Sequence, residues 1–197
     1  MHCYTQKRKQ VGLSFSISTK NRANAMMPEI QKILYTTDLS DNSAYAFRYA
    51  INFAKRHDAK IIILHVLEEL PSSAQAMIRQ YFNEEQQKKI SEENIAHTMD
   101  RIGQRLKIFC DRELKDDPES MDRIESIEIC KGYPANEILK KVDELECDAI
   151  VMGTHGKGII RDTYLGNMTK KVLRRVRKPV FIIPLPKGET DITFHDS

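Results

Sequence analysis

The hydrophobic positions follow two alternating periods from residue 30 onward. Short, nearly continuous apolar or β-branched runs predict strands, and they occupy residues 32–38, 60–66, 124–130, 148–153 and 178–184. Between them, apolar residues recur three and four positions apart, which predicts amphipathic helices over residues 44–57, 75–115, 135–146 and 166–176. Because strands and helices alternate, we expect an α/β fold with a parallel sheet, right-handed crossovers and helices on both faces.

The chain is long enough for one substantial domain, which we place at residues 28–187. Its 197 residues are 41% hydrophobic, enough for a single large core. The longest predicted helix has one apolar face that we assign to this core, formed by Ile95, Met99, Ile102, Leu106 and Phe109. Residues 1–27 show no usable period and are expected to be a disordered extension, and residues 188–197 form a short tail.

The net charge of +3 is unevenly distributed along the sequence. Residues 1–28 contain five bases and no acid, which leaves 26 bases against 28 acids in the remainder. The sequence pI of about 8.6 therefore reflects the extension and gives no sign of a basic nucleic-acid face on the folded part. We expect no nucleic-acid partner.

The spacing of the cysteines and the hydropathy of the chain indicate the cellular compartment of the protein. Cys3, Cys110, Cys130 and Cys147 lie far apart with no C-x-x-C pair, so we expect reduced thiols, no metal site and a cytoplasmic protein. No run approaches the roughly 18 to 20 consecutive apolar residues of a membrane-spanning helix, and no N-terminal run resembles a secretory signal. We expect no membrane partner.

Half of the eight glycines fall in one loop after the fourth predicted strand, at Gly153, Gly156, Gly158 and Gly166. Glycine lets backbone N–H groups approach a ligand without a Cβ in the way. Gly166 opens a predicted helix, whose free amides and positive dipole end favour an anion such as phosphate. Ligands of open parallel sheets bind beyond the carboxyl ends of the strands, so this loop and Thr36–Ser40 after the first strand should face one site.

The loop matches neither a Walker P-loop nor a dinucleotide fingerprint, but its spacing is G-x-x-G, nine residues, then G. In this respect it resembles the ATP-binding branch of the universal stress protein family. The resemblance covers Ile30 to Pro186 and includes KILYTTDLS, LHV, VMGTHGKG and KPVFIIP. It implies a five-stranded parallel sheet in the order 3-2-1-4-5 and a dimer that forms through the last strand, at Val180, Phe181, Ile182 and Ile183.

The resemblance also implies a set of nucleotide-binding residues. Asp38 would contact the ribose and the main chain of Val66 the adenine. Backbone groups would hold the phosphates at Gly153, Gly156, Gly166, Asn167 and Met168. We add five further candidates, namely Thr37, Met152, His155, Lys157 and Thr169.

Several of these residues have other possible roles. Asp38 could cap the following helix, as could Ser40 or Asp41. His155 could shape the backbone, contact phosphate or act as a base, and Lys157 could be an ordinary solvated cation. Thr169 could reach a phosphate or bond backbone. The family has Ser or Thr where this chain has Asn167, a side chain that can still donate a hydrogen bond.

The functional expectation is an ATP-binding, dimeric stress-response protein in which the nucleotide is a regulatory ligand. Mg²⁺ would accompany ATP, held mainly by phosphates and water. No catalytic residues are assigned, because the loops contain no recognisable hydrolytic machinery. The alternative is a protein–protein interaction module of the same fold that binds no nucleotide. An adenylating or ATP-pyrophosphatase enzyme is disfavoured, because TTDLSDNS lacks the S-G-G-x-D-S loop of those enzymes.

Overall fold

The structure is a computed structural model that describes residues 3–7, 28–69, 84–154 and 165–184. In chain order its elements are β1 (Cys3–Lys7), β2 (Lys32–Thr37), α1 (Asp41–His57), β3 (Lys60–Glu68), α3 (Glu84–Glu113), α4 (Pro118–Met121), β4 (Ile124–Gly132), α5 (Pro134–Glu144), β5 (Ala149–Gly153), α6 (Asn167–Leu173) and β6 (Val180–Ile183).

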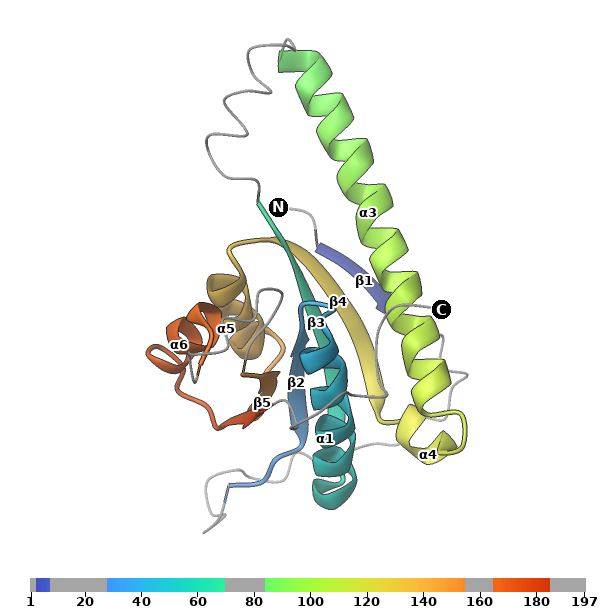
Figure 1. Cartoon of the computed structure of the whole chain (residues 1–197), viewed down its shortest axis with the longest axis vertical. Helices are drawn as coiled ribbons and strands as arrows, with labels where there is room; N and C mark the ends of the chain where they lie inside the picture. Colours follow the sequence, from blue (N-terminus) through green and yellow to red (C-terminus); the bar gives the residue numbers. More distant parts are fainter. Residues whose placement is uncertain (1–2, 8–27, 70–83, 155–164, 185–197) are drawn as a thin grey trace.

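The strands form one sheet in the order β1-β4-β3-β2-β5-β6 (Figure 1). Every neighbouring pair from β4 to β6 is parallel. Numbered among themselves along the chain, these five strands have the order 3-2-1-4-5, which confirms the predicted fold class. From β2 the chain adds β3 and then β4 on one side, and it returns to the other side of β2 to add β5 and β6. The order in which strands are added therefore reverses between β2 and β5, and this is the switch point where ligands of such sheets bind.

The first strand departs from the sequence prediction. Cys3–Lys7 was expected to be disordered, whereas it pairs antiparallel with β4, from Cys3 opposite Cys130 to Lys7 opposite Ser126. The five residues contain no long hydrophobic period, so the pairing depends on the unsatisfied backbone groups along the edge of β4 rather than on local sequence. Residues 8–27 lie outside the described part.

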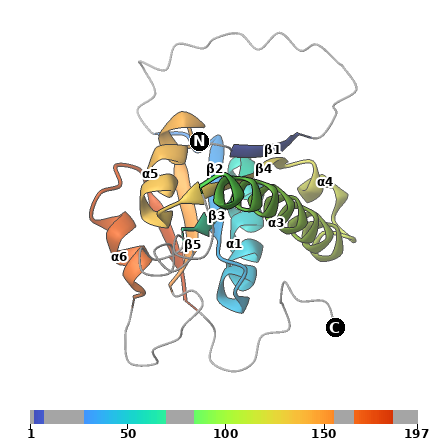
Figure 2. The ribbon, with the colours of Figure 1, turned by 90° about the horizontal axis from the view of Figure 1, so that it is seen from above.

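Helices cover both faces of the sheet, and Figure 2 shows them from above. On one face, α1 and α3 pack against alternate strand residues, including Ile33, Tyr35, Ile61 and Ile63. On the other face, α5 and α6 pack against the intervening ones, which include Leu34, Ile62, Leu64 and Ile150. Both sets are fully or almost fully buried because parallel strands with helices on each side expose neither face.

The apolar stripe of α3 belongs to the core, as predicted. Met99, Ile102, Leu106 and Phe109 are buried and Ile95 packs against them. The part of the predicted helical region at residues 75–83 lies outside the described residues. The turn expected at residues 115–122 contains the short helix α4, whose N-cap Asp117 accepts a hydrogen bond from the amide of Ser120.

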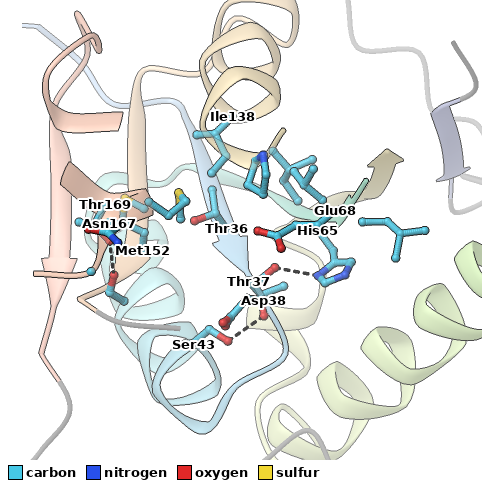
Figure 3. A pocket seen from close by; sticks show the side chains of 17 residues that line it. Thr36, Thr37, Asp38, Ser43, His65, Glu68, Ile138, Met152, Asn167 and Thr169 are labelled. Atoms are coloured by element: carbon cyan, nitrogen blue, oxygen red, sulfur yellow. Dashed lines mark hydrogen bonds between the residues drawn. The ribbon is translucent and has the colours of Figure 1, made fainter. Parts of the chain in front are cut away.

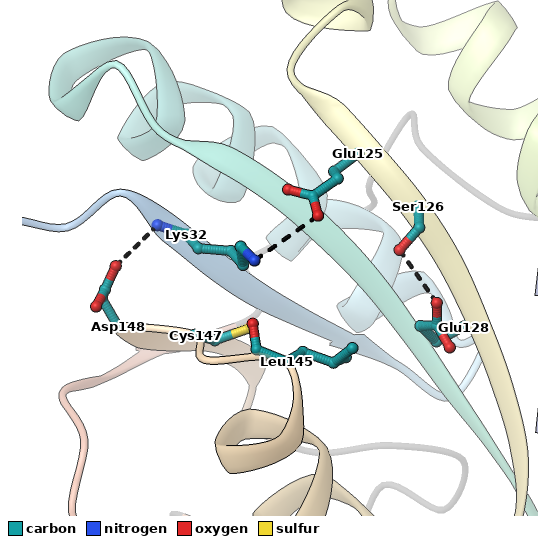
Figure 4. A network of polar contacts seen from close by, with 7 residues as sticks. All are labelled: Lys32, Glu125, Ser126, Glu128, Leu145, Cys147 and Asp148. Atoms are coloured by element: carbon teal, nitrogen blue, oxygen red, sulfur yellow. Dashed lines mark hydrogen bonds and ion pairs between the residues drawn. The ribbon is translucent and has the colours of Figure 1, made fainter. Parts of the chain in front are cut away.

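The amino ends of the strands, opposite the switch point, are fastened by polar contacts (Figure 4). Asp148 accepts hydrogen bonds from the amides of Gln31 and Lys32 at 2.9 and 3.0 Å, which joins the starts of β5 and β2. Lys32 Nζ reaches Glu125 of β4 at 3.7 Å. Beside them, burial raises the pKa of the Cys147 thiol to about 12, so this cysteine stays protonated at neutral pH.

Cys110, Cys130 and Cys147 are buried free thiols. Among the residues that the structure describes, no helix is both long and apolar enough to cross a membrane.

Candidate functional site

A pocket of about 530 Å³ opens at the carboxyl ends of the parallel strands (Figure 3). Its floor comes from the ends of β2, β3 and β5, and its walls come from the starts of α5 and α6. The volume lies within the roughly 300–1,000 Å³ of small-ligand sites. The pocket therefore occupies the switch point that the topology defines.

The loop after β2 places Asp38 at the pocket. Ser40, not Asp38, is the N-cap of α1, and it forms a capping box with Ser43. Asp38 Oδ1 accepts hydrogen bonds from the amide and hydroxyl of Ser40, at 3.2 and 2.6 Å. Between them Leu39 takes a left-handed φ of 64°, an unusual conformation for a branched residue, while its side chain is buried in the core. The turn is thus held on both sides with the Asp38 side chain half-buried at the pocket.

His65 connects β3 to the same loop. Its Nδ1 donates a hydrogen bond to the carbonyl of Thr37 at 2.9 Å, and the ring is 6% exposed (Figure 3). Because a carbonyl only accepts, this contact requires a proton on Nδ1. Thr37 Oγ1 meets Ser43 Oγ at 2.9 Å and accepts from the amide of Leu39 at 3.0 Å. These bonds fix the backbone at the end of β2.

Gly153, the last residue of β5, is required by close packing. A Cβ placed here would lie 2.7 Å from Asn42 Nδ2 and 3.0 Å from Asn42 Cγ. Asn42 belongs to the first turn of α1, is 4% exposed and donates to Thr154 Oγ1 at 3.5 Å. Its side chain therefore has little room to move, and only glycine lets α1 approach the end of β5 this closely.

The start of α6 is tied to the end of β5. The amide of Gly166, the N-cap, donates to the carbonyl of Thr154 at 2.9 Å, so it is engaged within the protein. The buried hydroxyl of Thr169 lies 3.3 Å from the carbonyls of both Gly153 and Thr154. The backbone role considered for Thr169 is thus the one observed, although the residue also lines the pocket. The first-turn amides of a helix, here from Asn167 onward, have no acceptor within the helix.

Most residues singled out from the sequence come together in the pocket. Nine of the twelve line it, namely Thr37, Asp38, Val66, Met152, Gly153, Gly166, Asn167, Met168 and Thr169. The other three, His155, Gly156 and Lys157, lie outside the described residues. Their proposed contacts with phosphate therefore stay predictions.

The pocket also contains residues that sequence reasoning missed: Ser43, Leu64, His65, Leu67, Glu68, Pro134 and Ile138. Thr36, which also lines it, belongs to the loop that was expected to face the site. A histidine near the end of the apolar run IIILHV was a usable signal, because a polar residue there marks the carboxyl end of a buried strand. Pro134 and Ile138 belong to α5 and form an apolar wall of the pocket. No ligand-binding motif in the sequence predicts this wall.

Charge is unequal along the pocket. The two carboxylates that line it, Asp38 and Glu68, come from the ends of β2 and β3. The lining residues from the start of α6, Gly166, Asn167, Met168 and Thr169, include no acid. In the described part of the chain, no three His, Cys, Asp or Glu residues gather as a metal site. The arrangement suits a ligand with hydroxyl or amine donors at one end and negative charge at the other.

Comparison with known proteins agrees with the fold. A sequence model described as the universal stress protein family matches residues 29–184. Universal stress protein MJ0531 of Methanocaldococcus jannaschii is 28% identical over 165 residues, which cover 81% of this chain and 85% of the relative. Universal stress protein MJ0577 of the same organism is 26% identical over 153 residues, covering 78% and 94%.

Two solved structures superpose on the chain. The structure of MJ0577 gives a TM-score of 0.58 at 26% identity and covers 82% of this chain and 100% of its own. The structure of the universal stress protein UspA from Lactobacillus plantarum gives 0.59 at 23% identity, with coverages of 80% and 99%, and so shares the fold.

Proposed function

Because the chain belongs to the universal stress protein family, we propose that its pocket binds ATP as a regulatory ligand. The observation that carries this proposal is the convergence of nine predicted nucleotide-binding residues on one pocket. They come from three strand ends and one helix start that lie far apart in the sequence. The glycine spacing, which resembles that of the ATP-binding branch of the family, supports ATP as the nucleotide.

The charge distribution supports one orientation of the nucleotide. The ribose hydroxyls donate to the Asp38 carboxylate, and the adenine lies against Val66 and the apolar wall from α5. The phosphates extend away from Asp38 and Glu68 toward the acid-free α6 side, where amides at Asn167 and Met168 can donate. Mg²⁺, held by phosphates and water, completes this arrangement.

Regulation rather than turnover is proposed because the described lining pairs no nucleophile with a base. His65 Nδ1 is occupied by the Thr37 carbonyl, and Ser43 Oγ bonds Thr37 Oγ1 and the carbonyl of Ser40. A cytoplasmic location, consistent with reduced thiols, is part of the same proposal.

Titration calorimetry with the full chain and MgATP tests the proposal. Wild-type protein is expected to bind in the micromolar range, and Asp38→Asn to bind at least about tenfold more weakly, because a charge-assisted hydrogen bond loses its charge. The amide Oδ1 of asparagine can still accept from Ser40, so the turn should survive.

Asp58→Asn is the matched control. Asp58 is the exposed left-handed C-cap of α1, where asparagine is well tolerated, and it lies away from the pocket lining. It should bind ATP as wild type does. If folded wild-type protein released no heat with MgATP, nucleotide binding would be refuted and the interaction module favoured. If Asp38→Asn bound ATP as tightly as wild type, the role of Asp38 would be restricted to stabilising the turn.

We also propose a homodimer through the β6 edge. Val180, Phe181 and Ile182 are only half-buried, although β6 is apolar and borders the described sheet. Beside it on α1, Phe53 contacts the Phe181 ring with centroids 4.4 Å apart, and Tyr49 is 39% exposed. An apolar strand edge flanked by exposed aromatic surface favours pairing with a second copy.

Sedimentation velocity at micromolar concentration is expected to show a dimer. Val180→Lys should shift the protein to monomer, because a lysine on an edge strand opposes pairing. Ile108→Lys, at a 52% exposed position on α3, is the matched control and should stay dimeric. A wild-type monomer, or a dimer that survives Val180→Lys, would contradict the proposed interface.

A further inference from the structure

Positive charge is concentrated on α6 and the segment that follows it. Six bases occur within nine residues, and we define them as the α6 basic surface: Lys170, Lys171, Arg174, Arg175, Arg177 and Lys178. Residues 165–184 contain no acid. The rest of the folded part has more acids than bases, so the positive charge of this surface is local and does not reflect the net charge of the whole fold.

These charges have no carboxylate partners within the described residues. Elsewhere in that part of the chain, Arg48, Lys55 and Arg123 reach carboxylates at 3.2, 2.8 and 2.8 Å. By contrast, Lys171 donates to the hydroxyl of Tyr133 and lies 4.8 Å from its ring centroid. Arg175 donates to the amide oxygen of Asn136 at 2.6 Å. Neutral partners hold these two cations in place and leave their charge uncompensated.

The basic surface faces outward. Lys171 in α6, Arg174 at its C-cap and Arg175 in the turn that follows are all exposed. Arg177 is exposed just beyond. Both ribbon views place α6 at the periphery, beside α5 (Figures 1 and 2). Leu173, 36% exposed, lies among the cations.

We propose that the α6 basic surface adsorbs to membranes that contain anionic lipid. Six clustered Lys and Arg residues attract acidic headgroups, each contributing about fivefold to binding near an anionic surface, and the exposed Leu173 among them can enter the interface. A flat lipid surface needs to meet only this one patch. This peripheral contact differs from a spanning helix, whose absence was the basis for expecting no membrane partner.

A nucleic acid fits the same surface less well. Single-strand binding relies on aromatic platforms for the bases, and in the described part of the chain the tyrosine that contacts this surface, Tyr133, has Lys171 over its ring. None of the six bases is among the residues that line the pocket, so this surface is separate from the proposed nucleotide site.

Flotation of the full chain with vesicles of phosphatidylcholine alone, or with 30% phosphatidylserine, tests the proposal. We expect at least tenfold stronger binding to the anionic vesicles, and a tenfold loss between 0.05 and 0.5 M NaCl. Arg174→Gln/Arg177→Gln should bind at least tenfold more weakly, because each basic residue near an acidic surface contributes about fivefold. Neither arginine side chain has a hydrogen bond or ion pair within the described residues, so folding should be preserved.

Two comparisons make the test specific. Arg174→Lys/Arg177→Lys keeps the charge and should bind as wild type does. Lys7→Gln/Lys9→Gln removes the same charge from the N-terminal extension and should also bind normally. Equal binding to both vesicle types, normal binding by the α6 glutamine variant, loss in the N-terminal variant, or tighter binding to a 20-base-pair DNA duplex at equal salt would each overturn the proposal.

Discussion

Gly153→Ala is expected to lower the free energy of unfolding by about 1–3 kcal/mol, the usual cost of overpacking a buried site. The added methyl would sit 2.7 Å from Asn42 Nδ2, and Asn42 is almost fully buried, so α1 and the end of β5 must separate. Because Gly153 also lines the pocket, ATP affinity should fall more than tenfold. Urea denaturation and titration calorimetry measure the two effects.

Asn42→Ala in the Gly153→Ala background provides the control. Shortening Asn42 makes room for the methyl group, so the double variant should be more stable than the sum of the two single losses predicts. A coupling energy near zero would show that Asn42 is not what restricts residue 153. Wild-type stability and affinity in Gly153→Ala would contradict the packing argument altogether.

Phe47→Ala should have the largest effect on stability, a loss of about 3–5 kcal/mol. The Phe47 side chain is fully buried, and its ring lies 5.5 Å from the Tyr35 centroid and 5.1 Å from that of Phe109. It therefore joins α1 to both β2 and α3. Since whole domains are stable by about 5–15 kcal/mol, urea denaturation should show a large fraction of the total lost.

Phe53→Ala is the comparison for this prediction. Phe53 is on the same helix and also contacts an aromatic ring, that of Phe181, but it is only half-buried. Its truncation removes less surface from the core and should cost less than half as much. Equal losses for the two variants would mean that the Tyr35–Phe47–Phe109 cluster does not organise the core.

The parallel sheet could be predicted from the sequence, because strands that are buried on both faces have nearly continuous apolar sequences. Runs such as KIIILHV in β3 have no polar alternation, and the intervening helices repeat every three or four residues. β1 could not be predicted in this way. Its sequence, CYTQK, carries no period, and its strand conformation depends on a partner 119 to 127 positions away, at Ser126–Cys130.

Sequence reasoning predicted the pocket residues that glycine spacing marks, but it did not predict the side-chain contacts that hold them in place. Gly153 and Gly166 stand out by spacing, but the reason for Gly153 is its contact with Asn42, a tertiary feature that no motif contains. Likewise, the engagement of the Thr169 hydroxyl by the end of β5 depends on how α6 docks. The left-handed φ of 64° at Leu39 could not be predicted either, because leucine rarely adopts this conformation.

The strand β1 also limits what the sheet offers to other chains. β4 has nine residues, and β1 pairs with five of them along the edge that faces away from β3. Without β1 that edge would present unpaired backbone N–H and C=O groups to other chains, whereas the apolar strand β6 borders the opposite margin of the described sheet. In the dimer proposed above, two copies would join through β6 and leave β1 as the outer strand at both margins of the pair. A strand of five residues offers little edge for a further chain, so such an assembly would stop at two copies.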